Sequence, residues 1–445
     1  MSEDAGEAFL GVERSLTGKR WRARLTDERG ALALAQQFDL PEIVARVLVA
    51  RDVGPENVEL FLNPTLRALL PDPAHLIDMD RAVVRIVAAI NAGETIGILG
   101  DYDVDGATSS ALLVRFFAAL GREAPVYIPD RQREGYGPNL PALMKLKEAG
   151  ASLVITVDCG TTAYDPLEAA VAAGLEIVVI DHHVAEPRLP AGCIVVNPNR
   201  ADETSSCGNL AAVGVSFLLV VALNRALREA YWYDEGHPEP DLMRWLDLVA
   251  LGTICDVVPL NGVNRALVTQ GLQIMAQRGN PGIAALADVA GVDRRLEAYH
   301  AGFVLGPRVN AGGRVGDSGL GVRLLTTGDA DEARAVAQRL DDYNRERQEI
   351  EQGVQEAALD QAERQSGGNR PLILVAGQGW HPGVIGIVAG RLRERFDRPA
   401  CVVALENGIG KGSGRSVPGV GLGPAIIAAH QAGILVNGGG HAMAA

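Results

Sequence analysis

Three carboxylates alternate along one short stretch of the sequence, Asp101-Tyr-Asp103-Val-Asp105-Gly106. The stretch follows a short apolar run at 96–99 and precedes residues 107–120, whose apolar positions recur at helical spacing. If the turn is extended, alternate side chains point the same way, and three like charges repel unless a cation or protons neutralise them. Two interpretations remain open: an acidic turn whose carboxylates cap the following helix, or a divalent-metal site built from hard oxygen ligands.

Two further apolar runs end in ionisable residues. Residues 153–157 lead into Asp158-Cys-Gly, and residues 177–180 lead into Asp181-His182-His183. Parallel strands place their C-terminal ends along one edge of a sheet, so we expect these clusters to converge on the first one. Taken alone, the two histidines could be buried structural residues; beside the carboxylates, a metal site is favoured.

A fourth carboxylate, Asp256, follows the apolar segment 248–254. A buried aspartate is costly unless it is paired or binds a ligand. Asp256 is therefore a further candidate for the same site.

Elements of an α/β fold must position these residues. Strands are expected at 96–99, 126–128, 153–157 and 177–180, and helices at 79–91, 107–120, 140–148, 167–173, 211–229 and 242–251. Continuous apolar strands with intervening helices indicate a parallel, doubly wound sheet covered on both faces.

The second half of the chain predicts a connector and a smaller α/β domain. The charged segment 329–365 reads as one long helix of roughly 55 Å. Strands at 372–375 and 400–404 and a helix at 383–395 are expected after it. The predicted division is an N-terminal lead-in (1–77), a catalytic domain (78–328), a connecting helix (329–369) and the smaller domain (370–445).

Composition limits the classes of function. The chain has 445 residues, a net charge of −14 and five cysteines without a CxxC pair, and its acidic N-terminus lacks signal-peptide order. These features predict a cytoplasmic protein without membrane association or structural zinc. The negative charge opposes nucleic-acid binding only on average, because a local basic groove decides it. Aromatic residues are 4%, so long base-stacking platforms are not expected.

Two glycine-rich segments carry arginines. Residues 306–314 could cradle a phosphate with backbone N–H groups and two guanidiniums, or could form a plain surface turn. Residues 410–416 lack the order of a nucleotide P-loop, but a loop with glycines, Ser413 and Arg415 can still hold a phosphate.

With these motifs in place, the chain resembles the DHH phosphoesterase superfamily and, within it, the RecJ family of bacterial exonucleases. The resemblance covers about residues 50–445 and includes Gly379-Trp-His-Pro-Gly383 and Gly438-Gly-Gly-His441, the latter typical of the accompanying DHHA1 domain. RecJ proteins usually continue into an OB-fold, which does not follow in this sequence. We therefore expect a truncated DHHA1 domain and weak, salt-dependent hold on DNA.

The resemblance implies two Mn²⁺ or Mg²⁺ ions, and the imidazole among the ligands favours Mn²⁺. The implied metal ligands are Asp101 (the least certain), Asp103, Asp105, Asp158, His182 and Asp256. Asp181 is expected to orient His182, His183 to face the scissile phosphate, and His381 to bridge the domains. Candidates for binding the substrate phosphate are Arg131, Arg308, Asn310, Arg314, Ser413, Arg415 and His441.

The implied function is hydrolysis of single-stranded DNA from its 5′ end by a two-metal mechanism, in DNA repair and recombination. A phosphodiesterase for short oligonucleotides or cyclic dinucleotides is the first alternative, and an inactive DNA-binding scaffold is the second. Implied partners are single-stranded DNA, a single-strand-binding protein and a helicase. We expect a monomer.

Overall fold

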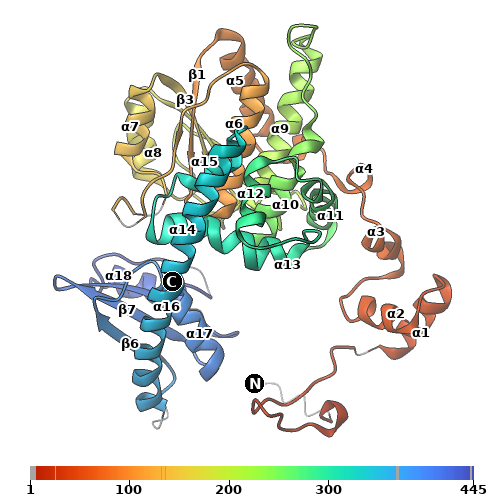
Figure 1. Cartoon of the computed structure of the whole chain (residues 1–445), viewed down its shortest axis with the longest axis vertical. Coiled ribbons are helices and arrows are strands. Elements are labelled where there is room, and N and C mark those ends of the chain that lie inside the picture. The colour runs from red at the N-terminus through yellow and green to blue at the C-terminus, as the bar shows by residue number, and fades with distance from the viewer. Residues whose placement is uncertain (1–6, 26, 132, 136, 367–369, 441–442) are drawn as a thin grey trace. The chain divides into compact units, whose positions relative to one another are not determined.

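The strands that precede the acidic clusters belong to a five-stranded, all-parallel sheet in the computed structural model of the chain (Figure 1). The structure describes residues 7–25, 27–131, 133–135, 137–366, 370–440 and 443–445. The strand order is β2-β1-β3-β4-β5. The strands are β1 (Thr95–Gly100), β2 (Val126–Tyr127), β3 (Ala151–Val157), β4 (Glu176–Ile180) and β5 (Ile194–Val196). The predicted parallel sheet is confirmed, and β5 is a strand that the sequence analysis missed.

Helices cover both faces of this sheet, as the unbroken apolar strands require (Figure 1). On one face, α7 and α8 pack through Leu143, Leu146 and Leu167 against Val154 and Val179. On the other face lie α6 and α9. The bounds are α5 (Met79–Ala92), α6 (Val104–Ala119), α7 (Leu140–Glu148), α8 (Tyr164–Ala172) and α9 (Ala212–Glu229).

A helical layer follows the sheet in the chain. Its helices are α10 (Leu246–Cys255), α11 (Gly262–Ala276), α12 (Pro281–Val289), α13 (Ala298–His300), α14 (Gly306–Val315) and α15 (Leu320–Thr326), with a π-helical turn, η5 (Ala301–Leu305), between α13 and α14. The prediction of a glycine-rich loop or turn at 306–314 is wrong: the segment is α14, whose backbone N–H groups serve the helix instead of a phosphate cradle.

The long charged helix is present as α16 (Ala330–Ser366), 37 residues or about 55 Å. It leads into a mixed sheet of order β6-β7-β8, in which β6 and β7 are parallel and β8 is antiparallel. This part comprises β6 (Ile373–Gln378), α17 (Ile385–Phe396), β7 (Ala400–Glu406), β8 (Ile409–Arg415) and α18 (Leu422–Gln431). The loop predicted at 410–416 is strand β8, which forms an antiparallel bridge between Arg415 and Ala444.

The described chain divides into two units of contacts. The smaller is Met1–Leu70 with Leu260–Ala266, and the larger is Pro71–Pro259 with Leu267–Ala445. The smaller contains α1 (Glu28–Gln37), α2 (Glu42–Val49), α3 (Val58–Leu62) and α4 (Leu66–Leu69), of which α1, α2 and α3 contribute to a core that includes Leu34, Ala45 and Leu48. The larger unit contains every described residue of the predicted site. Within the described ranges, no helix combines the length and apolarity needed to cross a membrane.

Candidate metal centre

The Asp101–Asp105 turn joins the end of β1 to the start of α6. Asp103 caps the helix, since its Oδ1 accepts hydrogen bonds from the backbone N of Asp105 at 2.9 Å and of Gly106 at 3.1 Å. A Cβ at position 106 would lie 2.4 Å from the carbonyl oxygen of Asp101, so only glycine fits this close turn. The capping interpretation is confirmed for Asp103. Only Oδ1 accepts the capping hydrogen bonds, and Oδ2 of Asp103 takes no part in them.

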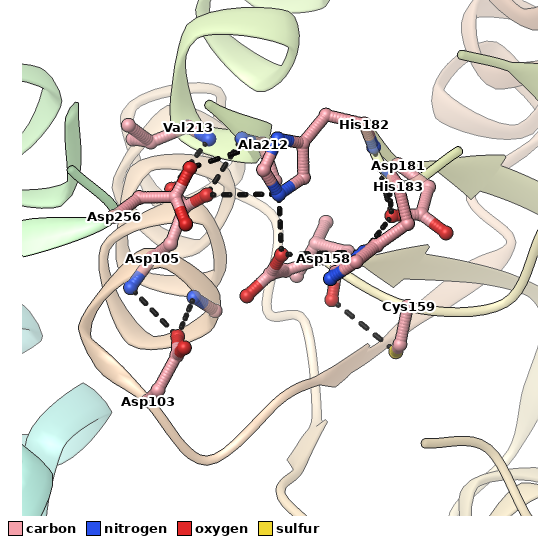
Figure 2. Close-up of polar contacts among 12 residues, drawn as sticks. Asp103, Asp105, Asp158, Cys159, Asp181, His182, His183, Ala212, Val213 and Asp256 are labelled. Atoms are coloured by element: carbon pink, nitrogen blue, oxygen red, sulfur yellow. Dashed lines mark hydrogen bonds and ion pairs between the residues drawn. The ribbon is translucent and has the colours of Figure 1, made fainter. Parts of the chain in front are cut away.

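Asp105 lies on the first turn of α6, but backbone groups of another helix hold its carboxylate. Its two oxygens accept hydrogen bonds from Ala212 N at 2.7 Å and Val213 N at 2.8 Å, at the N-terminal end of α9 (Figure 2). The helix dipole favours a negative charge there. Asp105 is therefore fixed in orientation although it is buried.

His182 follows β4 and points its ring at the carboxylates (Figure 2). Its Nδ1 lies 3.0 Å from the carbonyl oxygen of Leu210, which can only accept, so Nδ1 carries the proton. The lone pair is then on Nε2, 3.3 Å from Oδ1 of Asp158 and 3.8 Å from Oδ2 of Asp105. Burial lowers the pKa of His182 and keeps the ring neutral. A neutral, oriented imidazole is the form that binds metals.

The ring of His183 favours the protonated, positively charged form, in contrast to the neutral ring of His182. Its Nδ1 lies 2.8 Å from Oδ1 of Asp181, which also accepts from the backbone N of His182 and His183. Burial disfavours the charged ring, but this hydrogen bond and the charge of Asp181 raise the pKa of His183 to about 9. Burial likewise opposes ionisation of Asp181, yet its hydrogen bonds with His183 and Thr161 keep its pKa below the ordinary range.

The expectation that Asp181 orients the ring of His182 is wrong. The side chain of Asp181 holds the ring of His183, and the carbonyl of Leu210 holds that of His182. The sequence placed Asp181 next to both histidines, but only the path of the loop before α9 brings Leu210 to the first ring.

Seven of the predicted site residues converge in space. Their ligand atoms form three overlapping groups, each within 4.8 Å: Asp101, Asp103 and Asp158; Asp105, His182 and Asp256; Asp158, His182 and His183. Burial and mutual repulsion raise the pKa of Asp101, Asp105 and Asp158 well above the ordinary value, and burial and Asp103 raise that of Asp256 to about 7. Without a cation, the folded protein therefore opposes ionisation of these groups.

The donor set fits divalent cations. Oδ1 of Asp158 and Oδ2 of Asp256 are buried, and neither has a hydrogen-bond partner within the described residues. Such orphaned oxygens are costly unless something else binds them. Carboxylates with one imidazole suit Mn²⁺ and Mg²⁺.

Two asparagines that the sequence analysis missed support the histidine loop. Asn197 donates through Nδ2 to Thr161 Oγ1 at 2.8 Å and to the carbonyl of His183 at 2.9 Å, and Asn199 Nδ2 donates to the carbonyl of His182 at 2.6 Å. Both asparagines follow β5. Recognition of Ile194–Val196 as a strand would have placed Asn197 and Asn199 at the same edge as the other clusters.

The arginine candidates lie close to one another. Arg131 packs over the ring of Tyr102, 5.0 Å from its centroid, and donates to its hydroxyl. Arg314 donates to the carbonyl of Gly383 at 3.0 Å, which links α14 to the β6–α17 loop. Burial first, and then the charges of Arg314 and Arg131, lower the pKa of Arg415, so the three guanidiniums form one positive region. Ser413 Oγ lies 3.2 Å from Nη1 of Arg415.

Tyr102 is a further residue that the sequence analysis did not single out. A Cβ at Gly313 would lie 2.5 Å from its ring, so glycine at 313 makes room for it. Burial raises the pKa of Tyr102 to about 12. The neutral ring thus carries Arg131 beside the acidic turn.

Other candidates have structural contacts. Arg308 donates to Asp341 at 2.8 Å and to the carbonyl of Val304, and Asn310 Oδ1 accepts from Val104 N at 3.1 Å. Their predicted phosphate contacts are not supported by any of these interactions. His381 is half-buried, with Nδ1 accepting from Gly383 N at 3.0 Å, and burial lowers its pKa. His441 lies outside the described residues.

Comparison with known proteins gives matches along most of the chain. Residues 95–253 match the DHH family, N-terminal domain, and residues 369–445 match the DHHA1 domain. The chain is 42% identical over 417 residues to the single-stranded-DNA-specific exonuclease RecJ of Dickeya dadantii, which covers 91% of this chain and 72% of that protein. It is 39% identical over 434 residues to RecJ of Escherichia coli, and this match covers 95% of this chain and 74% of that protein.

Solved structures of RecJ proteins also match the fold of this chain. RecJ from Thermus thermophilus in complex with Mn²⁺ aligns with a TM-score of 0.78 and 32% identity, covering 94% of this chain and 58% of that one. The same protein in complex with Mg²⁺ aligns with a TM-score of 0.72 and 31% identity, covering 94% and 56%. The chain thus spans somewhat over half the length of the Thermus protein and nearly three quarters of the Dickeya and Escherichia ones.

Proposed function

The chain belongs to the RecJ family of single-stranded-DNA-specific exonucleases, and we propose from this premise that it hydrolyses single-stranded DNA with divalent metal ions. The observation that carries the proposal is the convergence of four acidic or histidine-bearing segments on one site, with two orphaned carboxylate oxygens. An inactive scaffold would not need to bear the cost of this like-charged, buried cluster.

Asp103, Asp105, Asp158, His182 and Asp256 would hold two ions, Mn²⁺ or Mg²⁺, with Asp101 beside them. When bound, such ions polarise a phosphate and lower the pKa of the water that they bind, so that this water can serve as a nucleophile at neutral pH. The protein's own part is to fix the ligands: Asp103 by capping α6, Asp105 through the N-terminus of α9, and His182 through Leu210. Held in this way, the ligands need no rearrangement during the reaction.

His183 supplies a positive charge at this site. Its ring is about one-third exposed and is kept protonated by Asp181, so it can donate a hydrogen bond from Nε2 to a non-bridging phosphate oxygen. Arg131, Arg314 and Arg415, with Ser413, would bind the terminal 5′-phosphate, and that contact would set the 5′-to-3′ direction. His381 would join the two domains through the Gly383 loop.

The wider role that we propose is DNA repair and recombination in the cytoplasm. The substrate is single-stranded DNA. A helicase would expose such strands, and a single-strand-binding protein would hold them. A protein that digests free single strands requires such strands to be exposed by another activity.

The test is digestion of end-labelled strands. Single strands, blunt duplexes and dinucleotides of one sequence are incubated with the protein and Mn²⁺, with EDTA as the control. We expect mononucleotide release from single strands starting at the 5′ end, and none with EDTA. Preference for dinucleotides would instead assign the protein to the short-oligonucleotide phosphodiesterases, and no hydrolysis of any substrate would favour the scaffold alternative.

A further inference from the structure

Two aromatic rings are stacked on each other at the protein surface. Tyr299 and Phe303 lie one helical turn apart, with ring centroids 5.4 Å apart and planes inclined by 27°. Tyr299 is 60% exposed and Phe303 is 74% exposed. Single exposed aromatics are ordinary, but a stacked, exposed pair in a chain with only 4% aromatic residues forms a continuous apolar surface that calls for an explanation.

The backbone that carries the pair packs against the helix that ends at the metal centre. Phe303 lies in η5, a π-helical turn, and such turns are rare and frequent at functional sites. The carbonyl oxygen of Ala301 lies 3.5 Å from Sγ of Cys255, the residue before Asp256. Glycines permit the close approach, since a Cβ at Gly306 would lie 2.5 Å from the same sulfur and one at Gly302 would lie 3.2 Å from Ile254.

The chain next to Asp256 is apolar and exposed as well. Val257 is 84% exposed and has a φ of 63°, an unusual conformation for a β-branched residue. Strain of this kind persists where the surrounding structure imposes it, often at ligand sites. Val257, just after α10, and Phe303, in η5, thus expose apolar side chains, and α10 and η5 pack against each other.

Two arginines lie close to the aromatic pair in the sequence. Nε of Arg294 lies 3.1 Å from Nε2 of His300, whose ring packs edge-on against Tyr299 at 5.8 Å. Arg294 and its neighbour Arg295 are both exposed. Exposed Asp293 and Glu297 flank the two arginines, so this segment has no net charge, but the two guanidiniums can still contact the anionic groups of a ligand whose flat rings stack on the aromatic pair.

We propose that Tyr299 and Phe303 form a stacking surface for bases of the single strand whose backbone enters the metal centre. The inference rests on the proposed function and deepens it. Every base has a flat π-face, so such a surface binds without sequence preference, and Arg294 and Arg295 would contact the adjoining phosphates.

The test measures strand affinity in EDTA, so that no cleavage occurs. Oligothymidylate of about twelve nucleotides, a length within the site sizes of single-strand-binding folds, is compared with versions that carry one abasic site at each position in turn. One base stack corresponds to roughly tenfold in affinity. We expect wild-type protein to lose about tenfold at one or two abasic positions, and Tyr299→Ala/Phe303→Ala to bind the intact strand about tenfold more weakly and to be insensitive to those positions.

Three variants act as controls. Tyr299→Phe/Phe303→Tyr keeps both rings and should bind like wild type, whereas Tyr299→Leu/Phe303→Leu keeps apolar bulk without rings and should bind like the alanine variant. Tyr231, which is 91% exposed, supplies Tyr231→Ala as a matched loss of a surface aromatic that should change nothing. Hydrolysis of the p-nitrophenyl ester of thymidine 5′-phosphate with Mn²⁺, which presents a single nucleoside and no strand beyond it, should stay unchanged in all variants.

The possible results distinguish a failure of the proposed stacking surface from a failure of the proposed function. If wild-type protein digests single strands but the alanine variant binds intact and abasic strands as wild type does, this inference is wrong. Loss of p-nitrophenyl ester hydrolysis in the alanine variant together with the leucine variant would also overturn it, because the metal centre would then be disturbed. If wild-type protein neither binds nor digests single strands, the proposed function fails and the inference fails with it.

Discussion

Nδ1 of His183 lies 2.8 Å from Oδ1 of Asp181, and this pair gives the centre a positive ring among carboxylates. Without the carboxylate charge, burial would favour the neutral ring. The pair therefore determines the range of pH over which His183 can donate a hydrogen bond.

We expect Asp181→Asn to lower the pKa of His183 from about 9 to near or below its ordinary value of 6.5. Because that pKa is raised in the folded protein, the charged ring is present at low pH and is lost as pH rises through it. Strand cleavage at saturating Mn²⁺ should then fall off at lower pH in the variant than in wild type. NMR titration of the ring in metal-free protein checks the cause, with Glu186→Gln at the surface as the control. An unchanged ring pKa would show that Asp181 does not set the charge of His183.

Asp158→Ala should abolish nearly all hydrolysis while the protein remains folded. Asp158 belongs to two of the three ligand groups, so its removal affects both proposed ion positions. Loss of several kcal/mol of transition-state stabilisation corresponds to a decrease in the rate of hydrolysis of at least about a hundredfold. The metal-free variant should melt no lower than wild type, because one member of a repelling cluster is gone. Turnover near the wild-type rate with Mn²⁺, measured on labelled single strands, would contradict this assignment.

The metal-free protein should lose thermal stability as pH rises. Asp256 has a pKa of about 7 when folded against an ordinary value of 3.8, and the pKa values of Asp101, Asp105 and Asp158 are raised as well. For groups raised in this way, stability is full below the unfolded pKa and decreases as pH rises through the folded one. Tyrosine- or dye-monitored melting in EDTA should therefore give a lower Tm at about pH 8 than at about pH 5.

Mn²⁺ should remove that decrease, since binding to the folded state adds stability and favours the ionised carboxylates. His183 acts in the same direction between its ordinary pKa of 6.5 and about 9, and the lowered pKa of His182 acts against it. Asp256→Asn, measured in parallel, should flatten the metal-free profile. A metal-free Tm that is constant or rises between about pH 5 and pH 8 would refute the prediction.

Arg415→Ala should weaken binding of 5′-phosphorylated strands more than binding of 5′-hydroxyl strands. Arg415 is adjacent to Ser413 and shares one positive region with Arg131 and Arg314. A charge-assisted hydrogen bond is worth about 1.5–3 kcal/mol, so roughly a tenfold or greater loss is expected for the phosphorylated end. Arg395→Ala, at an exposed position on α17, is the control. Equal losses for both ends would assign Arg415 to backbone tracking or packing.

Glu351→Ala should destabilise the junction between α16 and α17. The buried carboxylate pairs with Arg347 at 2.5 Å and with Arg391 at 2.6 Å. Removing it leaves two guanidiniums without this partner, at a cost of about 3 kcal/mol. Glu349→Ala, on the same helix and exposed, should change the melting temperature little. Indistinguishable melting of the two variants would mean that the pair contributes nothing to the junction.

The sequence by itself determined four of the five strands of the parallel sheet and the sheet edge at which the site lies. Apolar runs that end in Asp101, Asp158 and Asp181 are typical of buried strands, and parallel strands bring their C-terminal ends to one edge, so the clustering followed from local pattern alone. The long charged segment likewise predicted α16. These features depend on neighbours along the chain.

Tertiary structure decided which atoms meet. The hydrogen bonds that hold Asp105 at Ala212 and His182 at Leu210 join residues 107 and 28 positions apart, which no periodicity encodes. Glycine-rich residues 306–315 became a helix because α6, α15 and α16 pack against it, although glycine by itself disfavours helices. The stacking of Tyr299 on Phe303 beside the end of α10 depends on the π-turn that carries Phe303, and only packing against Cys255 places that turn next to Asp256.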